Sequence, residues 1–288
     1  MGMQLGVIFP QLEIGSEVEE IRTYGVEVER LGYRHIAAYD HVLGADRDVH
    51  DGFSGPYDLD STFQEPFVLF GYLAAVTTVE LVTSVVILPQ RQTALVAKQA
   101  AQVDRLTQGR FRLGVGVGWN PVEYEALGED FTRRGEREEE QIELLRLLWT
   151  QRSVTYVGRF DRVTGAGLAP LPVQQPIPIW LGGSSEPAYR RMGRLADGWF
   201  PQVPPDERLT RARETIAEAA MDAGRDPDAI GMEGRVSWGS AGLDKVIDHV
   251  GRWRDAGATH LSINTMGAGF ADLGEHLEAL AEVARAAR

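Results

Sequence analysis

The sequence predicts a (β/α)8 TIM barrel, an α/β fold in which eight parallel strands, each followed by a helix, close into a cylinder. Apolar β-branched runs alternate with helix-patterned segments along the chain, and 288 residues suit one such barrel. An open doubly wound sheet would carry a G-x-G-x-x-G turn after its first strand, but this chain reads "FPQLEIGS" there. We therefore expect a single barrel domain over residues 1–288.

The first half of the chain carries four strand and helix signals in order. The expected strands are apolar runs at residues 3–10, 34–40, 80–89 and 110–120. Ser16 and Glu19 have the spacing of a capping box before the first helix, and Gly32 is placed as its C-cap. Thr62 and Glu65 repeat the box spacing before the second helix, and a third helix is expected at 93–109.

The second half repeats the alternation after one interruption. Asn120, Pro121 and Glu123 suit the N-cap, N1 and N3 positions of the next helix, which restarts near residue 132 and ends near 149. "SVTYVGRFDRV" in segment 152–176 predicts a hairpin, followed by a Pro-rich connector. The last four strands are expected at 176–183, 197–202, 230–239 and 259–265.

Composition excludes several classes of function. A formal net charge of −13 argues against nucleic acid as a partner, and no apolar run reaches the length of a membrane span. The chain has no cysteine, which fits a cytoplasmic protein, and its first residues indicate a strand and not a signal peptide. The six histidines form no H-E-x-x-H motif, so we expect no metal.

Asp40 and His41 end the second expected strand, where a barrel places its active site. An imidazole beside a carboxylate there suits a general acid or base. Two other interpretations remain open: a loop-start aspartate that caps backbone amides beside a solvated histidine, and a metal ligand pair. The loop at 42–62 and the insertion at 152–176 are expected to wall the pocket, because loops on a barrel carry specificity.

Two Gly-rich stretches also fall at strand ends. In "GVGVGWNPVEY" (114–124), glycines at period two admit either a planar ligand or a neighbouring backbone, and the alternative is a tightly packed strand. In "WLGGSSEPAYRR" (180–191), amides and hydroxyls converge on a helix start, which favours a phosphate site over a plain serine cap.

Together these motifs resemble the luciferase-like monooxygenase superfamily, and within it the branch that uses the deazaflavin coenzyme F420. The resemblance spans the chain and is most specific at 102–128 and 176–199, with "YDHV" and "TSVVILPQR" in matching order. It implies a barrel with an insertion between strands four and five, and a homodimer. It also implies a non-prolyl cis peptide at Ser84–Val85 that supports the ring from behind.

The resemblance assigns roles to individual residues. His41, with Asp40, would manage the proton that accompanies hydride transfer, and Asp40 would contact the cofactor. The implied cofactor-binding residues are Asp40, Ser84, Val85, Gly116, Gly118, Trp119, Asn120, Gly182, Gly183, Ser184 and Ser185. Trp119 stands where the sugar-phosphate dehydrogenase branch has an acidic residue, which argues against a glucose-6-phosphate substrate.

The expected function is F420-dependent hydride transfer to or from a small organic substrate. Arg91 and Arg47 are candidate contacts for the acidic F420 tail, and four tryptophans suggest an aromatic cavity: Trp119, Trp180, Trp199 and Trp238. Two alternatives remain. One is an FMN-dependent monooxygenase that uses reduced flavin and O2. The other is a cofactor-binding protein without turnover.

Overall fold

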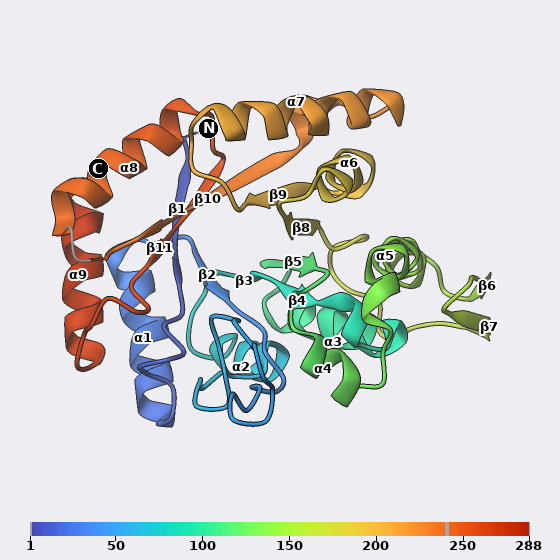
Figure 1. The fold of residues 1–288 in the computed structure, drawn as a ribbon, viewed down its shortest axis with the longest axis horizontal. Coiled ribbons are helices and arrows are strands. Elements are labelled where there is room, and N and C mark those ends of the chain that lie inside the picture. The colour runs from blue at the N-terminus through green and yellow to red at the C-terminus, as the bar shows by residue number, and fades with distance from the viewer. Residues whose placement is uncertain (1, 240–241, 288) are drawn as a thin grey trace.

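The computed structural model describes residues 2–239 and 242–287, which form a closed barrel of parallel strands with helices outside (Figure 1). The third strand is split in two, so the barrel strands are β1 (Gln4–Ile8), β2 (His35–Ala38), β3 (Glu80–Thr83) with β4 (Val86–Ile87), β5 (Phe111–Gly116), β8 (Ile179–Gly183), β9 (Gly198–Pro201), β10 (Gly231–Ser237) and β11 (His260–Asn264). β11 pairs with β1, and β5 pairs with both β3 and β4, which closes the ring. The predicted TIM-barrel fold is confirmed.

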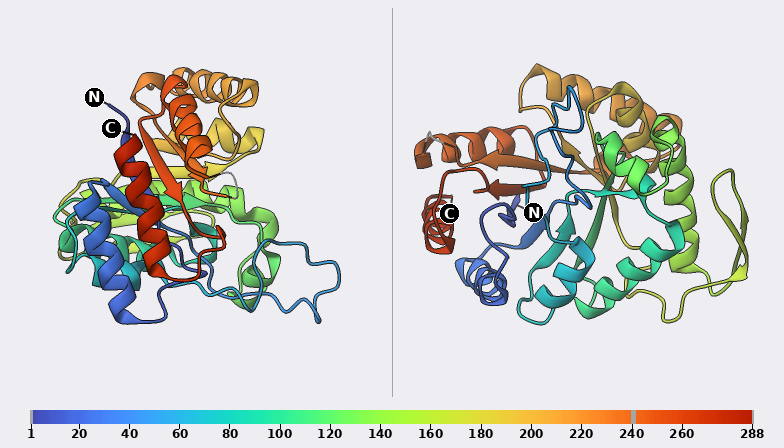
Figure 2. Two further views of the ribbon diagram at one scale, coloured as in Figure 1. Left: turned by 90° about the vertical axis from the view of Figure 1, so that its left-hand side faces the viewer. Right: turned by 60° about the horizontal axis from the view of Figure 1, so that its bottom comes forward.

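Helices surround the strands and bury their apolar faces against them (Figure 2). They are α1 (Val18–Leu31), α2 (Pro66–Leu73), α3 (Thr93–Leu106), α4 (Pro121–Ala126), α5 (Arg134–Thr150), α6 (Glu186–Leu195), α7 (Glu207–Asp222), α8 (Gly242–Asp255) and α9 (Leu273–Ala286). Short 3-10 turns occupy Leu88–Gln90, Phe131–Arg133 and Pro227–Ala229. Among the residues described, no helix has both the length and the apolar composition needed to cross a bilayer.

The ends of the helices confirm some of the predicted cap residues and contradict others. Gly32 is the C-cap of α1, with φ 94°, and Asn120 caps α4 by accepting from the amide of Val122 at 3.0 Å. The capping box at Ser16 is wrong, because α1 begins two residues later and Glu19 pairs with Arg22.

The second predicted capping box is also wrong. Glu65 is itself the N-cap of α2 and accepts from the amide of Val68 at 2.8 Å. The Thr62 hydroxyl donates instead to the carbonyl oxygen of Gln11 at 2.8 Å. The threonine therefore ties the 42–62 loop to the loop after β1.

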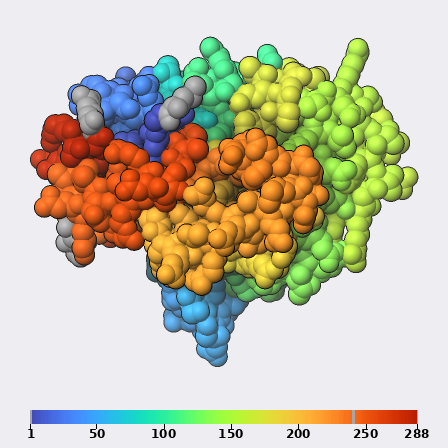
Figure 3. Space-filling view, turned by 90° about the horizontal axis from the view of Figure 1, so that it is seen from above, coloured from blue at the N-terminus to red at the C-terminus, as the bar shows by residue number. Residues whose placement is uncertain are grey.

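The insertion between strands four and five forms the predicted hairpin, β6 (Val154–Val157) and β7 (Arg162–Ala166). It lies on the outside of the barrel beside α3 and α5 and not over the mouth (Figure 1). The hydroxyl of Thr93 donates to Asp161 at 2.6 Å, and the amide of Val173 donates to Asp104 at 2.6 Å. The expectation that this segment walls the pocket is therefore wrong. The loop at 42–62 does project from the body at the mouth (Figure 3).

A buried ionic network fills the lower half of the barrel. Glu233 bonds His35 Nε2 at 3.0 Å, the hydroxyl of Ser262 at 2.6 Å and Arg112 Nη1 at 2.9 Å. Burial raises the pKa of the Glu233 carboxyl, but His35 and Arg112 more than offset this and hold the pKa well below its usual range. The Arg112 guanidinium also lies 4.3 Å from the ring centre of Trp180. This layer closes the barrel beneath the mouth.

Candidate active site

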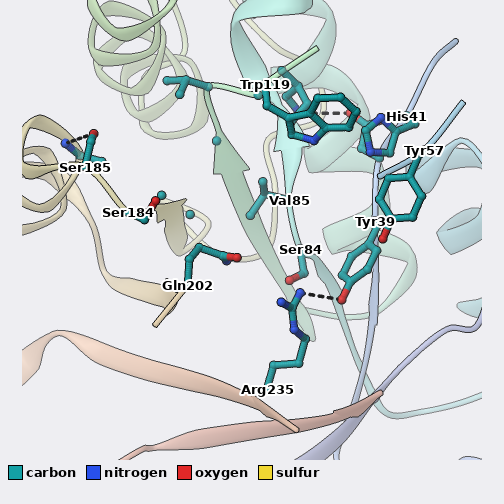
Figure 4. Close-up of a pocket in the computed structure, with 18 residues that line it drawn as sticks. Tyr39, His41, Tyr57, Ser84, Val85, Trp119, Ser184, Ser185, Gln202 and Arg235 are labelled. Carbon is teal, nitrogen blue, oxygen red and sulfur yellow. Dashed lines mark hydrogen bonds between the residues drawn. The ribbon is translucent and has the colours of Figure 1, made fainter. Parts of the chain in front are cut away.

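A cavity of about 430 Å³ opens at the carboxyl ends of the barrel strands (Figure 4). It brings together nearly all the residues that the sequence singled out, namely Asp40, His41, Ser84, Val85, Gly116, Gly118, Trp119, Gly182, Gly183, Ser184 and Ser185. Asn120 lies outside it and lines a neighbouring cavity beneath the 42–62 loop. A volume of this size is typical of sites for cofactors and small molecules.

The floor of the cavity is the interruption between β3 and β4, where the Ser84–Val85 peptide is cis as expected. Val85 sits between two glycines on the neighbouring strands. A Cβ on Gly116 would lie 2.7 Å from Val85 Cγ2, and one on Gly182 would lie 3.2 Å from Val85 Cγ1. The glycines of the fourth strand therefore make room for the bulged third strand. These contacts show tight packing of a neighbouring chain segment against Gly116, and the approach of a planar ligand to this strand stays a prediction.

His41 stands at the mouth and is paired with a residue far along the chain. Its Nδ1 lies 3.4 Å from the carboxylate of Glu123, on the first turn of α4. The rings of Tyr57, Phe63 and Trp119 surround the imidazole, with centroids 4.7–5.6 Å away. The imidazole is thus held at Nδ1 inside an aromatic collar.

Glu123 also holds the start of the 42–62 loop. Its Oε1 accepts from the amides of Val42 at 2.8 Å and Leu43 at 3.3 Å. Burial raises the pKa of the Glu123 carboxyl, but these bonds and His41 outweigh burial, so the net shift is downward. An ionised Glu123 favours the His41 tautomer that carries its proton on Nδ1 and leaves Nε2 available as a proton acceptor.

Asp40 is buried and forms an ion pair beneath the cavity rim. Its Oδ1 accepts from Arg91 Nη2 at 2.8 Å, and Oδ2 accepts from the amide of Ile87 at 3.1 Å. Arg91 also bonds Glu65 at 3.0 Å. Desolvation raises the pKa of the Asp40 carboxyl, and Arg91 opposes that rise only in part. Asp40 thus ties β2 to β4 and has little surface for a ligand.

Both arginines proposed to receive an acidic tail are already paired. Arg91 is held by Asp40 and Glu65, and the Arg47 guanidinium bonds Asp58 at 2.5 Å within the loop. Acidic neighbours thus offset both positive charges, and the contact of these arginines with an acidic tail stays a prediction. Sequence position alone could not show their acidic partners.

The Gly-rich turn between β8 and α6 lines the cavity with Gly182, Gly183, Ser184 and Ser185. Ser185 is the N-cap, accepts from the amide of Ala188 at 3.4 Å, and so fulfils the serine-cap interpretation. The hydroxyl of Ser184 has no hydrogen-bond partner among the described residues. Pro187 occupies the second helical position and has no N–H. The serine cap is therefore formed, and the phosphate site at this turn stays a prediction.

Of the four tryptophans expected to include members of an aromatic cavity, one lines the cavity. Trp119 alone among them lines the described cavity and is 38% exposed. Trp180 and Trp199 are buried in the core, and Trp238 packs against Phe270 with ring centres 6.1 Å apart. A tryptophan in a barrel strand faces either the helices or the lumen, and residue type does not distinguish these.

Several lining residues were not singled out in the sequence, namely Tyr39, Ile87, Ala188 and Arg235, whereas Tyr57 belongs to the 42–62 loop that was expected to wall the pocket. The Arg235 guanidinium donates to the Tyr39 hydroxyl at 2.8 Å across the cavity (Figure 4). The alternation of polar residues at 233, 235 and 237 could have indicated an inward-facing charge, since β-strand side chains alternate faces. The sequence placed Glu123 at the start of a helix and gave no sign of its contact with His41.

The acidic and imidazole side chains of the site do not converge as a metal would require. Over residues 2–239 and 242–287, no three of His, Asp or Glu gather closely enough to hold an ion. Asp40 faces Arg91, and Glu123 faces His41 and two amides.

Comparisons with known proteins place this geometry in context. Among curated proteins, an uncharacterised protein of Mycobacterium tuberculosis is 30% identical over 221 residues, 75% of each chain. The FMNH2-dependent dimethylsulfone monooxygenase of Pseudomonas fluorescens is 32% identical over 191 residues, 64% of this chain and 50% of that one. Among solved structures, an F420-dependent secondary alcohol dehydrogenase in complex with an F420–acetone adduct gives a TM-score of 0.81 at 18% identity, covering 100% of both chains.

The structural likeness shows a shared fold, and the family follows from the sequence. A model of the luciferase-like monooxygenase family matches residues 3–260, which include every candidate site residue named above. The chain therefore belongs to the luciferase-like monooxygenase family.

Proposed function

We propose that this protein is an F420-dependent oxidoreductase that transfers hydride between the deazaflavin and a small organic substrate. The observation that carries the proposal is the His41–Glu123 pair, held at 3.4 Å over the Ser84–Val85 floor. Hydride transfer to or from a carbonyl or imine needs a matched proton donor or acceptor. When bound, the deazaflavin supplies the redox chemistry, and the protein supplies position and charge.

The cavity fits such a cofactor by its shape and its donors. Val85, packed between Gly116 and Gly182, gives the floor an apolar side chain. Gly182, Gly183, Ser184 and Ser185 would hold the phosphate, and Ser84, Val85, Gly116, Gly118 and Trp119 would hold the ring. Asp40 would support the cofactor site indirectly by fixing β4 through the amide of Ile87. Asn120 would do so by capping α4 through the amide of Val122.

His41 would accept or deliver the proton at Nε2 while Glu123 holds Nδ1. The aromatic collar of Tyr57, Phe63 and Trp119 would keep water from the imidazole. Exclusion of water strengthens the electrostatic coupling of such a pair. The same collar would face an apolar part of the substrate.

FMN is the second candidate cofactor, and the chain would then be a monooxygenase using reduced flavin and O2. Similarity to the dimethylsulfone monooxygenase favours it. Chain length is compatible with either cofactor, because an F420-dependent alcohol dehydrogenase and an FMN-containing Baeyer–Villiger monooxygenase both match this chain over its full length. A cofactor-binding protein without turnover is the third candidate, and a complete His41–Glu123 pair argues against it.

We further propose that the protein acts as a homodimer in the cytoplasm. The absence of cysteine fits a reducing compartment. Sedimentation equilibrium would test the assembly, and a monomeric mass would contradict it.

Titration followed by absorbance tests the cofactor assignment directly. The protein is titrated with F420, with FMN and with riboflavin, which carries the FMN ring system without its phosphate. We expect saturable binding of F420, weak binding of FMN and still weaker binding of riboflavin. Substitution Ser184→Ala should weaken F420 binding, whereas Ser153→Ala, on the exposed turn before β6, should not. Tight FMN binding without F420 binding would refute the proposal.

A further inference from the structure

Arg235 extends from β10 into the mouth of the barrel. Side chains alternate along this strand, so Glu233, Arg235 and Ser237 share the inner face. Gly234 faces outward, where a Cβ would collide with the Trp253 ring of α8. Glu233 belongs to the buried network below, which leaves Arg235 as the charged residue of this strand within the cavity.

The positive charge of Arg235 has no acidic partner among the residues that the structure describes. Its Nη1 donates to the Tyr39 hydroxyl at 2.8 Å, and its guanidinium carbon lies 5.9 Å from the centre of that ring. Arg112, one layer lower, shows the contrast, because Glu80 and Glu233 take its Nε and Nη1. Arg235 therefore presents the remaining donors of its guanidinium to the cavity.

The acidic residue that lines the same cavity does not neutralise Arg235. Asp40 is the carboxylate among the described lining residues, and it is committed to Arg91 at 2.8 Å. The cavity thus carries a net positive group in a protein whose formal charge is −13. Local charge, and not the total, determines which small ligand is attracted.

A second cavity of about 270 Å³ adjoins the first and shares Arg235 and Gln202 with it. It adds His249 and Arg252 from α8, and its described lining contains no Asp or Glu. Arg235 therefore stands at a junction whose far side is also basic. Two independent features, an unpaired inward arginine and a basic adjoining cleft, point to an anion at the junction.

We propose that Arg235 binds a carboxylate of the substrate, so that the enzyme acts on small organic acids rather than neutral alcohols or ketones. An arginine presents two parallel donors that match a carboxylate, and Tyr39 fixes the plane of the guanidinium. The reacting carbon would then lie between this anchor and His41. The statement that the bound acid is a substrate rests on the proposed function, whereas the binding of a carboxylate to Arg235 does not.

Matched aromatic probes test the charge preference. Calorimetry measures binding of 1-naphthoate and of neutral 1-naphthalenemethanol, to the protein alone and after loading with F420. We expect the acid to bind about tenfold or more tightly than the alcohol, which is about 1.4 kcal/mol. Arg235→Gln should abolish the preference and Arg235→Lys should keep part of it. Arg208→Gln, which breaks an exposed pair with Asp206, should change nothing.

Equal affinity for the two probes would overturn the proposal, as would a preference that survives in Arg235→Gln. So would the absence of saturable naphthoate binding up to about 10 mM, since even millimolar affinity corresponds to about −4 kcal/mol. If F420 displaces naphthoate and FMN does not, the site holds the glutamate tail of the cofactor and the substrate assignment fails. If FMN binds in place of F420 but the preference persists, only the cofactor assignment fails.

Discussion

Substitution Glu123→Gln isolates the contact that gives His41 its proposed role. The side-chain oxygen of Gln can keep accepting from the amides of Val42 and Leu43, which in the wild type donate to Glu123 Oε1 at 2.8 and 3.3 Å. The NH2 group must then replace Oε2, which faces His41 Nδ1 at 3.4 Å. Because NH2 can only donate, the imidazole has to move its proton from Nδ1 to Nε2 or lose the bond.

The expected cost follows from these three bonds. Two amide bonds change from a charged to a neutral acceptor, which costs about 1 kcal/mol each, and the His41 bond costs about 1 kcal/mol if lost. Relief of carboxylate burial offsets part of this, so we expect about 2–3 kcal/mol at pH 7. At about 2 °C per kcal/mol for a chain of this size, the melting temperature should fall by about 4–6 °C.

The pH dependence gives a second signature. The Glu123 pKa lies below its ordinary value of 4.5 in the folded protein. Its ionised form therefore contributes stability that is present above pH 4.5 and is lost as the pH falls through the folded pKa. The difference between wild type and Glu123→Gln should shrink accordingly in acid.

Urea unfolding across pH and the ¹⁵N spectrum of the histidines measure both effects. Glu125→Gln is the matched control, because it makes the same change at an exposed position of the same helix and should be neutral. If Glu123→Gln keeps both its stability and an Nδ1–H tautomer at His41, the pairing does not orient the imidazole and the reasoning fails.

Three further predictions concern His41, the Arg91–Asp40 pair and the partly buried His260 of β11. His41→Ala should lower turnover by about 10²–10⁴ with cofactor affinity unchanged; steady-state rates and an F420 titration check this, and unaltered turnover would exclude a proton-transfer role. Arg91→Met should cost about 3–5 kcal/mol in urea unfolding because it leaves Asp40 buried without its partner, whereas exposed Arg190→Met should cost less than about 1 kcal/mol. Burial, and after it Arg112, lowers the pKa of His260 to about 3. The stability that neutral His260 contributes is therefore present above its ordinary pKa of 6.5 and is lost as the pH falls toward 3. His260→Asn should reduce the slope of unfolding free energy against pH in this range by up to about 1.4 kcal/mol per pH unit, and an unchanged slope in urea unfolding would contradict this.

The repeating part of this structure could be predicted from the sequence. Periodic apolar runs and cap residues such as Gly32 and Asn120 are local signals, and eight strand–helix units leave few topologies. Once the barrel is assumed, strand ends must gather at one rim. That single constraint placed His41, Ser84 and Ser184 in one cavity.

The electrostatic partners could not be predicted in the same way. His41 and Glu123 are 82 residues apart, and Arg91 lies 51 residues from Asp40. Which charge meets which depends on side-chain direction and helix placement, not on sequence spacing. The partners of Arg91, which are Asp40 and Glu65, therefore could not be identified from its position at the end of a strand.

The fate of the 152–176 segment escaped prediction for a similar reason. It follows a helix and precedes a strand, so it starts from the end of the barrel opposite the active site. Its hairpin then binds α3 and α5 through Thr93 and Glu140, on the outer surface. A loop between a strand and the next helix, such as 42–62, is the kind that reaches the mouth.

The fit between Val85 and its flanking glycines has a consequence for building chimaeras from related barrels. Residues 83–87 and 114–118 are complementary in outline, since Cβ atoms on Gly114, Gly116 and Gly118 would meet Thr83, Val85 and Ile87 in turn. The two segments should therefore be inherited together. A crossover between them would set an ordinary strand beside glycines, which leaves a void, or a bulged strand beside side chains, which makes a collision.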